Sequence, residues 1–197
     1  MEFEILPNML STGFRVFDMI FGKIEILAIE VEFVETKNSV SYGHFRFWVG
    51  GQEVGNFQEV ISFNASKKSL SRFLKMDDQR FDKDLDNSSK EEIFKALFDS
   101  IVATIPEGAT VTEYLKERGG DSRDFSYLEK MGFQERFHLD EVGQEAFRDK
   151  VNLLLLKRSD SFERLIWRDL KTMVVMEKVL PPGFFVQTAN EFLSWQK

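Results

Sequence analysis

Apolar and polar residues alternate early in the chain in a way that predicts a β-strand. Within Lys23 to Glu35, every second residue from Leu27 to Phe33 is apolar, and Glu30 and Glu32 lie between them. A period of two places successive side chains on opposite faces of a strand, so this segment should form a half-buried strand. Its apolar face would carry Leu27, Ile29, Val31 and Phe33.

A second alternating segment, His44 to Val49, follows the polar stretch Thr36 to Ser41. Gly50-Gly51 can supply the positive φ angles of a tight hairpin turn, and Val54 to Phe63 is then expected to pair back as another strand. The first third of the chain therefore predicts an antiparallel meander. Phe45, Phe47 and Val49 would share one face of the second strand, and His44, Arg46 and Trp48 the other.

Beyond residue 64 the spacing of apolar residues becomes helical. Ser88 and Glu91 have the spacing of a capping box, which satisfies the free amides at a helix start, so a helix is predicted from there to Pro106. A shorter helix is expected before it, and residues 112–132 should be helical on either side of Gly119-Gly120. The apolar faces would carry Leu70, Phe73 and Leu74 in the short helix, and Ile93, Leu97 and Ile101 in the capped helix.

The last part of the chain predicts a second hairpin and a closing helix. Val151 to Lys157 is an apolar run, and Phe162 to Arg168 alternates after a short polar turn. Met173 to Val179 would add a third strand before Pro181-Pro182-Gly183 ends it. Helical spacing then predicts an amphipathic helix from Phe184 to Trp195, with Phe185, Ala189, Phe192 and Trp195 on its apolar face.

Strands and helices are segregated along the chain instead of alternating one by one, which favours the α+β class over a doubly wound parallel fold. We expect one antiparallel sheet, built from the N-terminal and C-terminal hairpins and covered by helices. A length of 197 residues is within what one hydrophobic core can organise, so a single domain over residues 1–197 is predicted. Residues 1–18 are a candidate N-terminal extension.

Composition narrows the classes of function. The net charge of −7 argues against nonspecific binding to nucleic acid or to an anionic membrane, because both require Lys and Arg to neutralise phosphates or headgroups. The chain has no cysteine, and its start, Met1 to Glu4, lacks the basic and long apolar regions of a signal peptide. A soluble protein that stays in the cytoplasm is expected.

The sequence offers little to a catalytic interpretation. The two histidines, His44 and His138, have no recognisable motif around them, and the glycine-rich signatures of hydrolases, dinucleotide-binding and nucleotide-binding proteins do not occur. Asp82-x-Asp84-x-Asp86 resembles the start of a calcium loop, but Asn87 and Ile93 occupy the positions that need glycine and a bidentate glutamate. The sequence predicts a protein that binds a partner, with no enzymatic activity, no metal site and no cofactor.

A cluster of acidic residues between positions 77 and 86 is the predicted partner-binding site. A local excess of carboxylates can steer a basic protein toward the surface. An ordinary solvated face is the alternative, because charge runs mostly serve solubility. The candidate residues are Asp77, Asp78, Asp82, Asp84 and Asp86.

Three stretches of the chain together resemble the immunity protein 42 family of bacterial polymorphic toxin systems. They are Met19-Ile20-Phe21-Gly22 with Ala28-Ile29-Glu30; Tyr42 to Gly51 running into Val54-Gly55-Asn56; and Arg164 to Arg168 followed by Pro182-Gly183-Phe184-Phe185. The resemblance spans about Met19 to Trp195. It implies a protein that neutralises a cognate toxin by tight binding in the producing cell, with no cofactor and no enzymatic residues.

Two other classes stay open at this point. Paired Asp and Glu side chains could meet in space to form a small hydrolase or carbohydrate-acting enzyme, which would need two carboxylates in one pocket with one pKa raised. A general adaptor or regulatory subunit would differ from an immunity protein chiefly in its partner.

Overall fold

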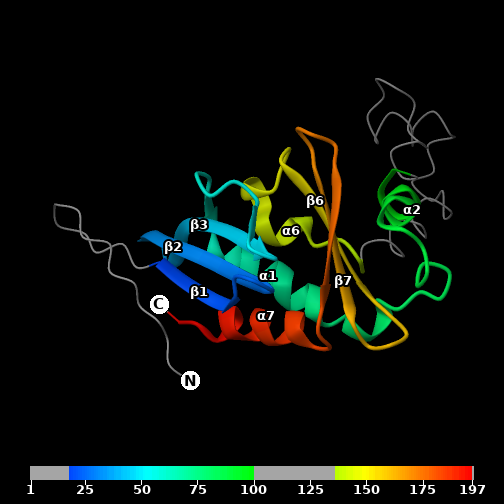
Figure 1. Cartoon of the computed structure of the whole chain (residues 1–197). Coiled ribbons are helices and arrows are strands. Elements are labelled where there is room, and N and C mark those ends of the chain that lie inside the picture. The colour runs from blue at the N-terminus through cyan, green and yellow to red at the C-terminus, as the bar shows by residue number, and fades with distance from the viewer. Residues whose placement is uncertain (1–17, 100–135, 197) are drawn as a thin grey trace, which may run out of the picture.

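The computed structural model describes residues 18–99 and 136–196, and in them two antiparallel sheets are surrounded by helices (Figure 1). The predicted α+β class is confirmed. The first sheet contains β1 (Asp18–Lys23), β2 (Leu27–Lys37), β3 (Val40–Val49), β4 (Gln52–Val54) and β5 (Val60–Ser62). The second contains β6 (Val151–Lys157), β7 (Glu163–Asp169) and β8 (Val175–Leu180).

The N-terminal sheet has the strand order β1-β2-β3-β4, with β5 also paired to β3. Its two long strands have the faces that the alternation predicted. Phe33 is only half-buried, and a β-bulge interrupts the pairing directly after it, between Phe33 and Glu35. The other predicted core residues are buried: Leu27, Ile29, Val31, Phe45, Phe47 and Val49.

The prediction of one continuous strand over Val54 to Phe63 is wrong, although Val54 in β4 and the residues of β5 do pair back with β3. The chain leaves the sheet after β4 at Gly55, whose φ is +109° and where a Cβ would lie 2.5 Å from the ring of Phe147. It returns for the three residues of β5. The side chain of Ser62 then accepts a hydrogen bond from the amide of Ala65, and this cap begins a helix at Phe63.

The prediction that both hairpins join one sheet is also wrong, because they form separate sheets. The free edge of β6 is already occupied by other segments. Leu139 donates its amide to Leu153 at 3.0 Å, Leu155 donates to Phe137 at 2.9 Å, and Lys157 donates to Arg80 at 3.0 Å. These bonds satisfy the backbone groups that a strand of the first sheet would otherwise have to pair with.

Two helices cover the inward face of the N-terminal sheet. They are α1 (Phe63–Leu74) and α7 (Phe184–Ser194), and Figure 1 shows α7 running beside β1 and α1 lying between the two sheets. The ring of Phe45 on β3 lies 5.7 Å from that of Phe192 on α7, in an edge-on contact. The predicted closing helix and short helix are confirmed, with Leu70, Phe73, Phe185, Ala189 and Phe192 buried.

The capped helix begins one residue later than predicted. Ser89 and Glu92 make the reciprocal capping-box bonds, whereas the Ser88 hydroxyl donates to the carbonyl of Asp84 at 3.1 Å. This helix, α2 (Lys90–Phe94), continues as a π-helix, η2 (Lys95–Asp99). Ile101 and the predicted helical residues 112–132 lie outside the described residues. Short helical turns complete the described fold: η1 (Asp77–Gln79), α6 (Asp140–Gly143) and η3 (Gln144–Ala146).

The buried apolar side chains form two clusters. The larger one contains residues of both sheets, α1 and α7, including Phe47 and Leu165. The smaller one lies on the other face of the C-terminal sheet, where Ile93 and Leu97 pack against Leu154 and Ile166. A core shared by the two sheets agrees with one domain over residues 1–197, which stays a prediction. Within residues 18–99 and 136–196, none of the helices is long and apolar enough to cross a bilayer.

Candidate functional site

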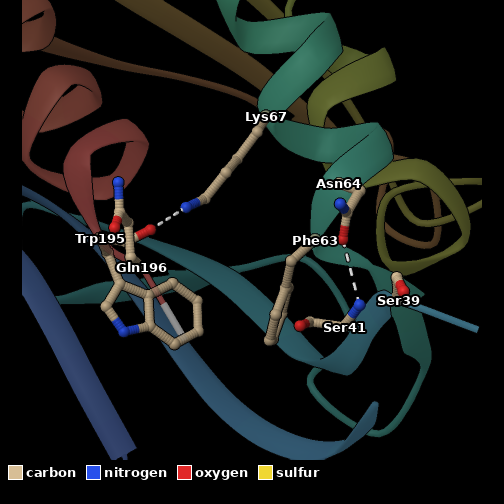
Figure 2. A pocket seen from close by; sticks show the side chains of 7 residues that line it. All are labelled: Ser39, Ser41, Phe63, Asn64, Lys67, Trp195 and Gln196. Atoms are coloured by element: carbon tan, nitrogen blue, oxygen red, sulfur yellow. Dashed lines mark hydrogen bonds between the residues drawn. The ribbon is translucent and has the colours of Figure 1, made fainter. Parts of the chain in front are cut away.

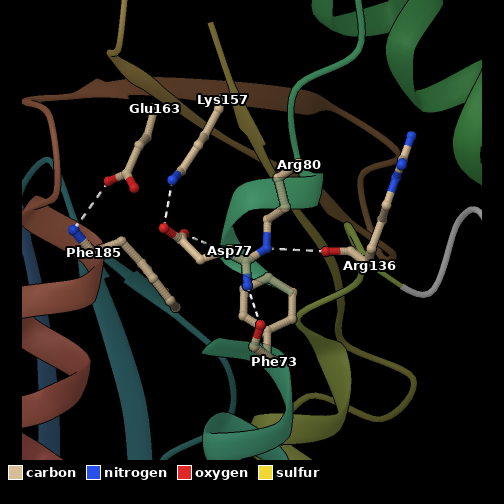
Figure 3. Close-up of polar contacts among 7 residues, drawn as sticks. All are labelled: Phe73, Asp77, Arg80, Arg136, Lys157, Glu163 and Phe185. Carbon is tan, nitrogen blue, oxygen red and sulfur yellow. Dashed lines mark hydrogen bonds and ion pairs between the residues drawn. The ribbon is translucent and has the colours of Figure 1, made fainter. Parts of the chain in front are cut away.

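The predicted partner-binding residue Asp77 belongs to a buried ionic network (Figure 3). Its Oδ1 accepts a hydrogen bond of 2.6 Å from Nη1 of Arg80, and its Oδ2 accepts one from Nζ of Lys157. Both carboxylate oxygens are therefore occupied, one by Arg80, which directly follows η1, and the other by Lys157 of β6. An aspartate held in this way stabilises the fold and has little freedom to meet a partner.

Arg80 is the centre of this network and is fully buried. Its Nε donates to the carbonyl of Arg136 at 3.0 Å, its Nη2 donates to the carbonyl of Phe73, and its guanidinium lies 3.7 Å from the centre of the Phe73 ring. Burial lowers the pKa of Arg80 to about 10, against the opposing effect of the Asp77 and Glu163 carboxylates. The group still carries its charge at neutral pH, so the network contains a real buried cation.

Glu163 on β7 is the second acid of the network and, unlike the half-buried Asp77, is almost completely buried. Its Oε2 accepts the amide of Phe185 in the first turn of α7 at 3.1 Å, whereas its Oε1 is buried without a hydrogen-bond partner among the described residues. Burial raises the pKa of Glu163, and the nearby charge of Asp77 adds to the shift. Neither Glu163 nor Asp77 lines either of the two described pockets.

The other four predicted aspartates divide into two kinds. Asp82 accepts the amide of Asp84 at 3.0 Å and lies 3.5 Å from Nη2 of Arg136. Asp86 accepts the amide of Ser159 at 3.1 Å, and its hydrogen bonding with Ser159 lowers the pKa of the Asp86 carboxyl. The side chains exposed to solvent are those of Asp78 and Asp84. The structure thus brings the acidic segment to the surface but leaves two of its five carboxylates available to a partner.

A second polar cluster lies on the outward face of the N-terminal sheet, opposite the helices. Glu30 on β2 pairs in register with Arg46 on β3, and its Oε2 accepts hydrogen bonds from Nε of Arg46 at 2.7 Å and from Nε1 of Trp48 at 2.5 Å. Nη1 of Arg46 also lies 2.9 Å from Oε1 of Glu53 on β4. Although Glu30 is on the open face, only 6% of its surface is exposed, because Arg46 and Trp48 cover it.

Aromatic rings flank this arginine. The guanidinium carbon of Arg46 lies 4.7 Å from the Trp48 ring centre and 4.1 Å from that of Phe57, which reaches the face from the loop between β4 and β5. The ring of His44 lies 5.7 Å from that of Phe57. We call the set Glu30, His44, Arg46, Trp48 and Phe57 the aromatic–arginine cluster.

A cavity of about 320 Å³ lies between the start of α1, the tip of the β2–β3 hairpin and the end of α7 (Figure 2). Lys67 donates its ammonium to the carbonyl of Trp195 and, at 3.5 Å, to that of Leu193, and burial lowers the pKa of Lys67. The lining residues, which include no acid or histidine, offer donors for a polar group but no nucleophile with a base. They are Ser39, Ser41, Phe63, Asn64, Lys67, Trp195 and Gln196.

The histidines make structural contacts. Nδ1 of His44 lies 3.3 Å from the carbonyl of Glu59, and Nε2 of His138 lies 3.1 Å from the carbonyl of Leu97. Among residues 18–99 and 136–196, no three His, Asp or Glu side chains gather closely enough to hold a metal ion.

The family model for immunity protein 42 matches residues 19–195. The chain belongs to the immunity protein 42 family. This match confirms the resemblance stated from the sequence. No curated protein and no solved structure matches the chain.

In this immunity protein 42 chain, two of the three stretches that carried the resemblance meet in the aromatic–arginine cluster. Glu30 ends the first stretch, and His44, Arg46 and Trp48 come from the second. The alternation along the two strands predicts that these side chains lie on polar faces, but no local motif marks them as a site. The signal was the pairing of an acid with an arginine on the polar faces of adjacent predicted strands, which is visible only once the register is known.

Proposed function

We propose that this immunity protein 42 family member binds a cognate toxin protein and neutralises it, without catalysing a reaction. The observation that carries the proposal is the family match over residues 19–195, nearly the whole chain. The protein would act in the cytoplasm of the producing cell. Since neutralisation by binding needs only a complementary surface, the proposal requires no cofactor.

The charge of the chain supports a basic partner. A toxin that acts on nucleic acid needs a basic cleft, and a binder with a net charge of −7 would both approach such a cleft quickly and block it. In this proposal Asp77, Asp78, Asp82, Asp84 and Asp86 act together as a source of negative potential. Direct contacts would come from Asp78 and Asp84, whose side chains are exposed.

The enzymatic alternative draws no support from the described carboxylates. Asp77 and Glu163 are a pair in which one pKa is raised, but Asp77 is bound to Arg80 and Lys157, and Glu163 is almost completely buried. A raised pKa that results from burial in a structural network is a consequence of folding. A general adaptor function would use the same kind of surface with a different partner.

The test takes a candidate toxin from the genes adjacent to the one that encodes this chain. The two proteins are co-expressed, and growth is compared with expression of the toxin alone. The purified toxin is then titrated with the purified chain. Restored growth, and inhibition that is complete at an equimolar ratio, are expected. A folded chain that neither restores growth nor binds this toxin would overturn the pairing.

Steering by the acidic segment is tested separately with Asp78→Asn/Asp84→Asn, because the other three aspartates hold the fold. The association rate with the toxin should fall and become less sensitive to salt, since screening acts on the charges that have been removed. If the variant associates as fast as the wild type at low salt, the acidic segment does not contribute to association. The proposed binding function would be unaffected.

A further inference from the structure

We propose that the outward face of the N-terminal sheet, centred on the aromatic–arginine cluster, is the surface that holds the toxin after encounter. The proposal rests on the proposed function and adds a site and a partner chemistry to it. The occupant is a protein surface that presents Lys or Arg side chains next to apolar ones.

The cluster is built to be rigid. One carboxylate oxygen of Glu30 receives hydrogen bonds from both Arg46 and Trp48, and Arg46 also reaches Glu53, so three strands are connected across the face. Charge-assisted bonds of this kind fix a long side chain in one rotamer. A partner that meets Arg46 and Trp48 would therefore lose little of the binding energy to ordering them.

The residue types are those that dominate the energy of protein interfaces. Trp and Arg are enriched among the few residues whose truncation weakens a complex strongly. Here the guanidinium of Arg46 is in cation–π contact with the rings of both Trp48 and Phe57, on the sheet face opposite the helices. Ile20 and Val60, at 40% and 47% exposure, add apolar surface beside the cluster. Their register with Glu30 and His44 places them on the same face.

The charges around the cluster indicate the sign of charge that a partner surface should carry. Glu32 pairs with His44 and Glu35 with Tyr42, so both acids point outward with the cluster, and Glu53 lies opposite Trp48. Together with Glu30, these residues place four carboxylates on this face, whereas the cations on it are Arg46 and Lys37. The excess of negative charge favours a cationic partner surface. It also opposes pairing of this face with the same face of a second copy, because like charges would meet.

The experiment measures dissociation of the chain from the candidate toxin of the preceding test, because buried anchors act mainly on the off-rate whereas distant charges act on the on-rate. Glu32→Lys/Glu35→Lys reverses two charges on the outward face without touching the cluster's own bonds. Trp48→Ala removes an anchor. The matched control, Glu91→Lys/Glu141→Lys, makes the same change of charge at exposed residues of α2 and α6.

Each outcome decides the proposal. We expect the dissociation rate to rise at least about tenfold in the Glu32/Glu35 variant and about thirtyfold in Trp48→Ala, with the control within about twofold of the wild type. If Trp48→Ala fails to fold, the Glu32/Glu35 variant decides alone. If the folded Glu32/Glu35 variant dissociates from the toxin at the wild-type rate, the proposed binding surface is wrong and the proposed immunity function is unaffected. Failure of the wild type to bind the toxin overturns both.

Discussion

Asp77 and Arg80 are three residues apart and meet in an ion pair of 2.6 Å in which the guanidinium is fully buried. The pair connects the end of α1 to β6, because Asp77 also binds Lys157 and Arg80 binds the carbonyl of Phe73. A buried cation is tolerated only when its donors are paired, so removing one partner should cost far more than removing a surface charge.

Asp77→Asn should therefore destabilise the protein by about 3 kcal/mol, since Arg80 would keep its charge and lose its closest carboxylate. Equilibrium unfolding in urea measures the change. The control is Asp78→Asn, a neighbouring exposed aspartate, whose stability should match that of the wild type. Equal effects of the two substitutions would show that the buried pair contributes nothing specific to stability.

The sequence predicted the strands best where polar and apolar residues strictly alternate. β2 and β3 were found because Glu30, Glu32 and Arg46 mark their outward faces. β1 was not predicted because its outward residue opposite Glu30 is Ile20, so the centre of the segment, Met19 to Phe21, is apolar without alternation. The separation into two sheets depended on backbone bonds from residues 80 and 137–139 to β6, for which no local pattern exists.

The acidic segment shows what charge alone leaves undetermined, namely which carboxylates are bound within the fold. Asp77, Asp82 and Asp86 look alike in the sequence, but each is bound by a group distant in the chain: Lys157, Arg136 and Ser159. The cluster of Glu30 and Arg46 shows the converse. Glu30 and Arg46 are 16 residues apart, and only the register of β2 and β3 shows that they pair.

Gly43→Ala should destabilise the N-terminal sheet by about 2 kcal/mol or more through overpacking. A Cβ at this position would lie 2.1 Å from the carbonyl oxygen of Glu32 and 2.4 Å from the ring of Phe63, and the backbone oxygen cannot move aside easily. Thermal and urea unfolding measure the loss. Gly51→Ala is the control, because no atom lies within 4 Å of the new methyl group and its cost is only that of a side chain at positive φ, about 1 to 2 kcal/mol. A Gly43→Ala protein as stable as the wild type would refute the close approach of α1 to the sheet.

Lys67→Met should loosen the end of α7. The methionine keeps an apolar stem beside Trp195 and Phe192 but loses the hydrogen bonds to the carbonyls of Leu193 and Trp195, which should cost about 1 kcal/mol. Hydrogen exchange in the last turn of α7 should accelerate, with a smaller change in global stability. Lys68→Met, at the exposed neighbouring position, serves as the control and should leave that exchange unchanged.

Glu163→Gln should change the pH dependence of stability in a defined direction. Because burial raises the pKa of Glu163 in the folded protein, its contribution to stability is present below the pKa of the unfolded chain, about 4.3, and is lost as pH rises through the folded value. Glutamine does not titrate, so the stability of the variant relative to the wild type should improve between about pH 4 and about pH 7.5. Urea unfolding at both pH values measures this difference, with Glu145→Gln, at an exposed carboxylate, as the baseline for the general effect of pH. The test is the change of relative stability with pH. The absolute stability of the variant is not informative, because its amide group replaces a carboxylate oxygen that already lacks a hydrogen-bond partner among the described residues. A relative stability that stays constant, or that falls as pH rises, would mean that Glu163 is charged in the folded protein without penalty and that Arg80 and Lys157 outweigh its burial.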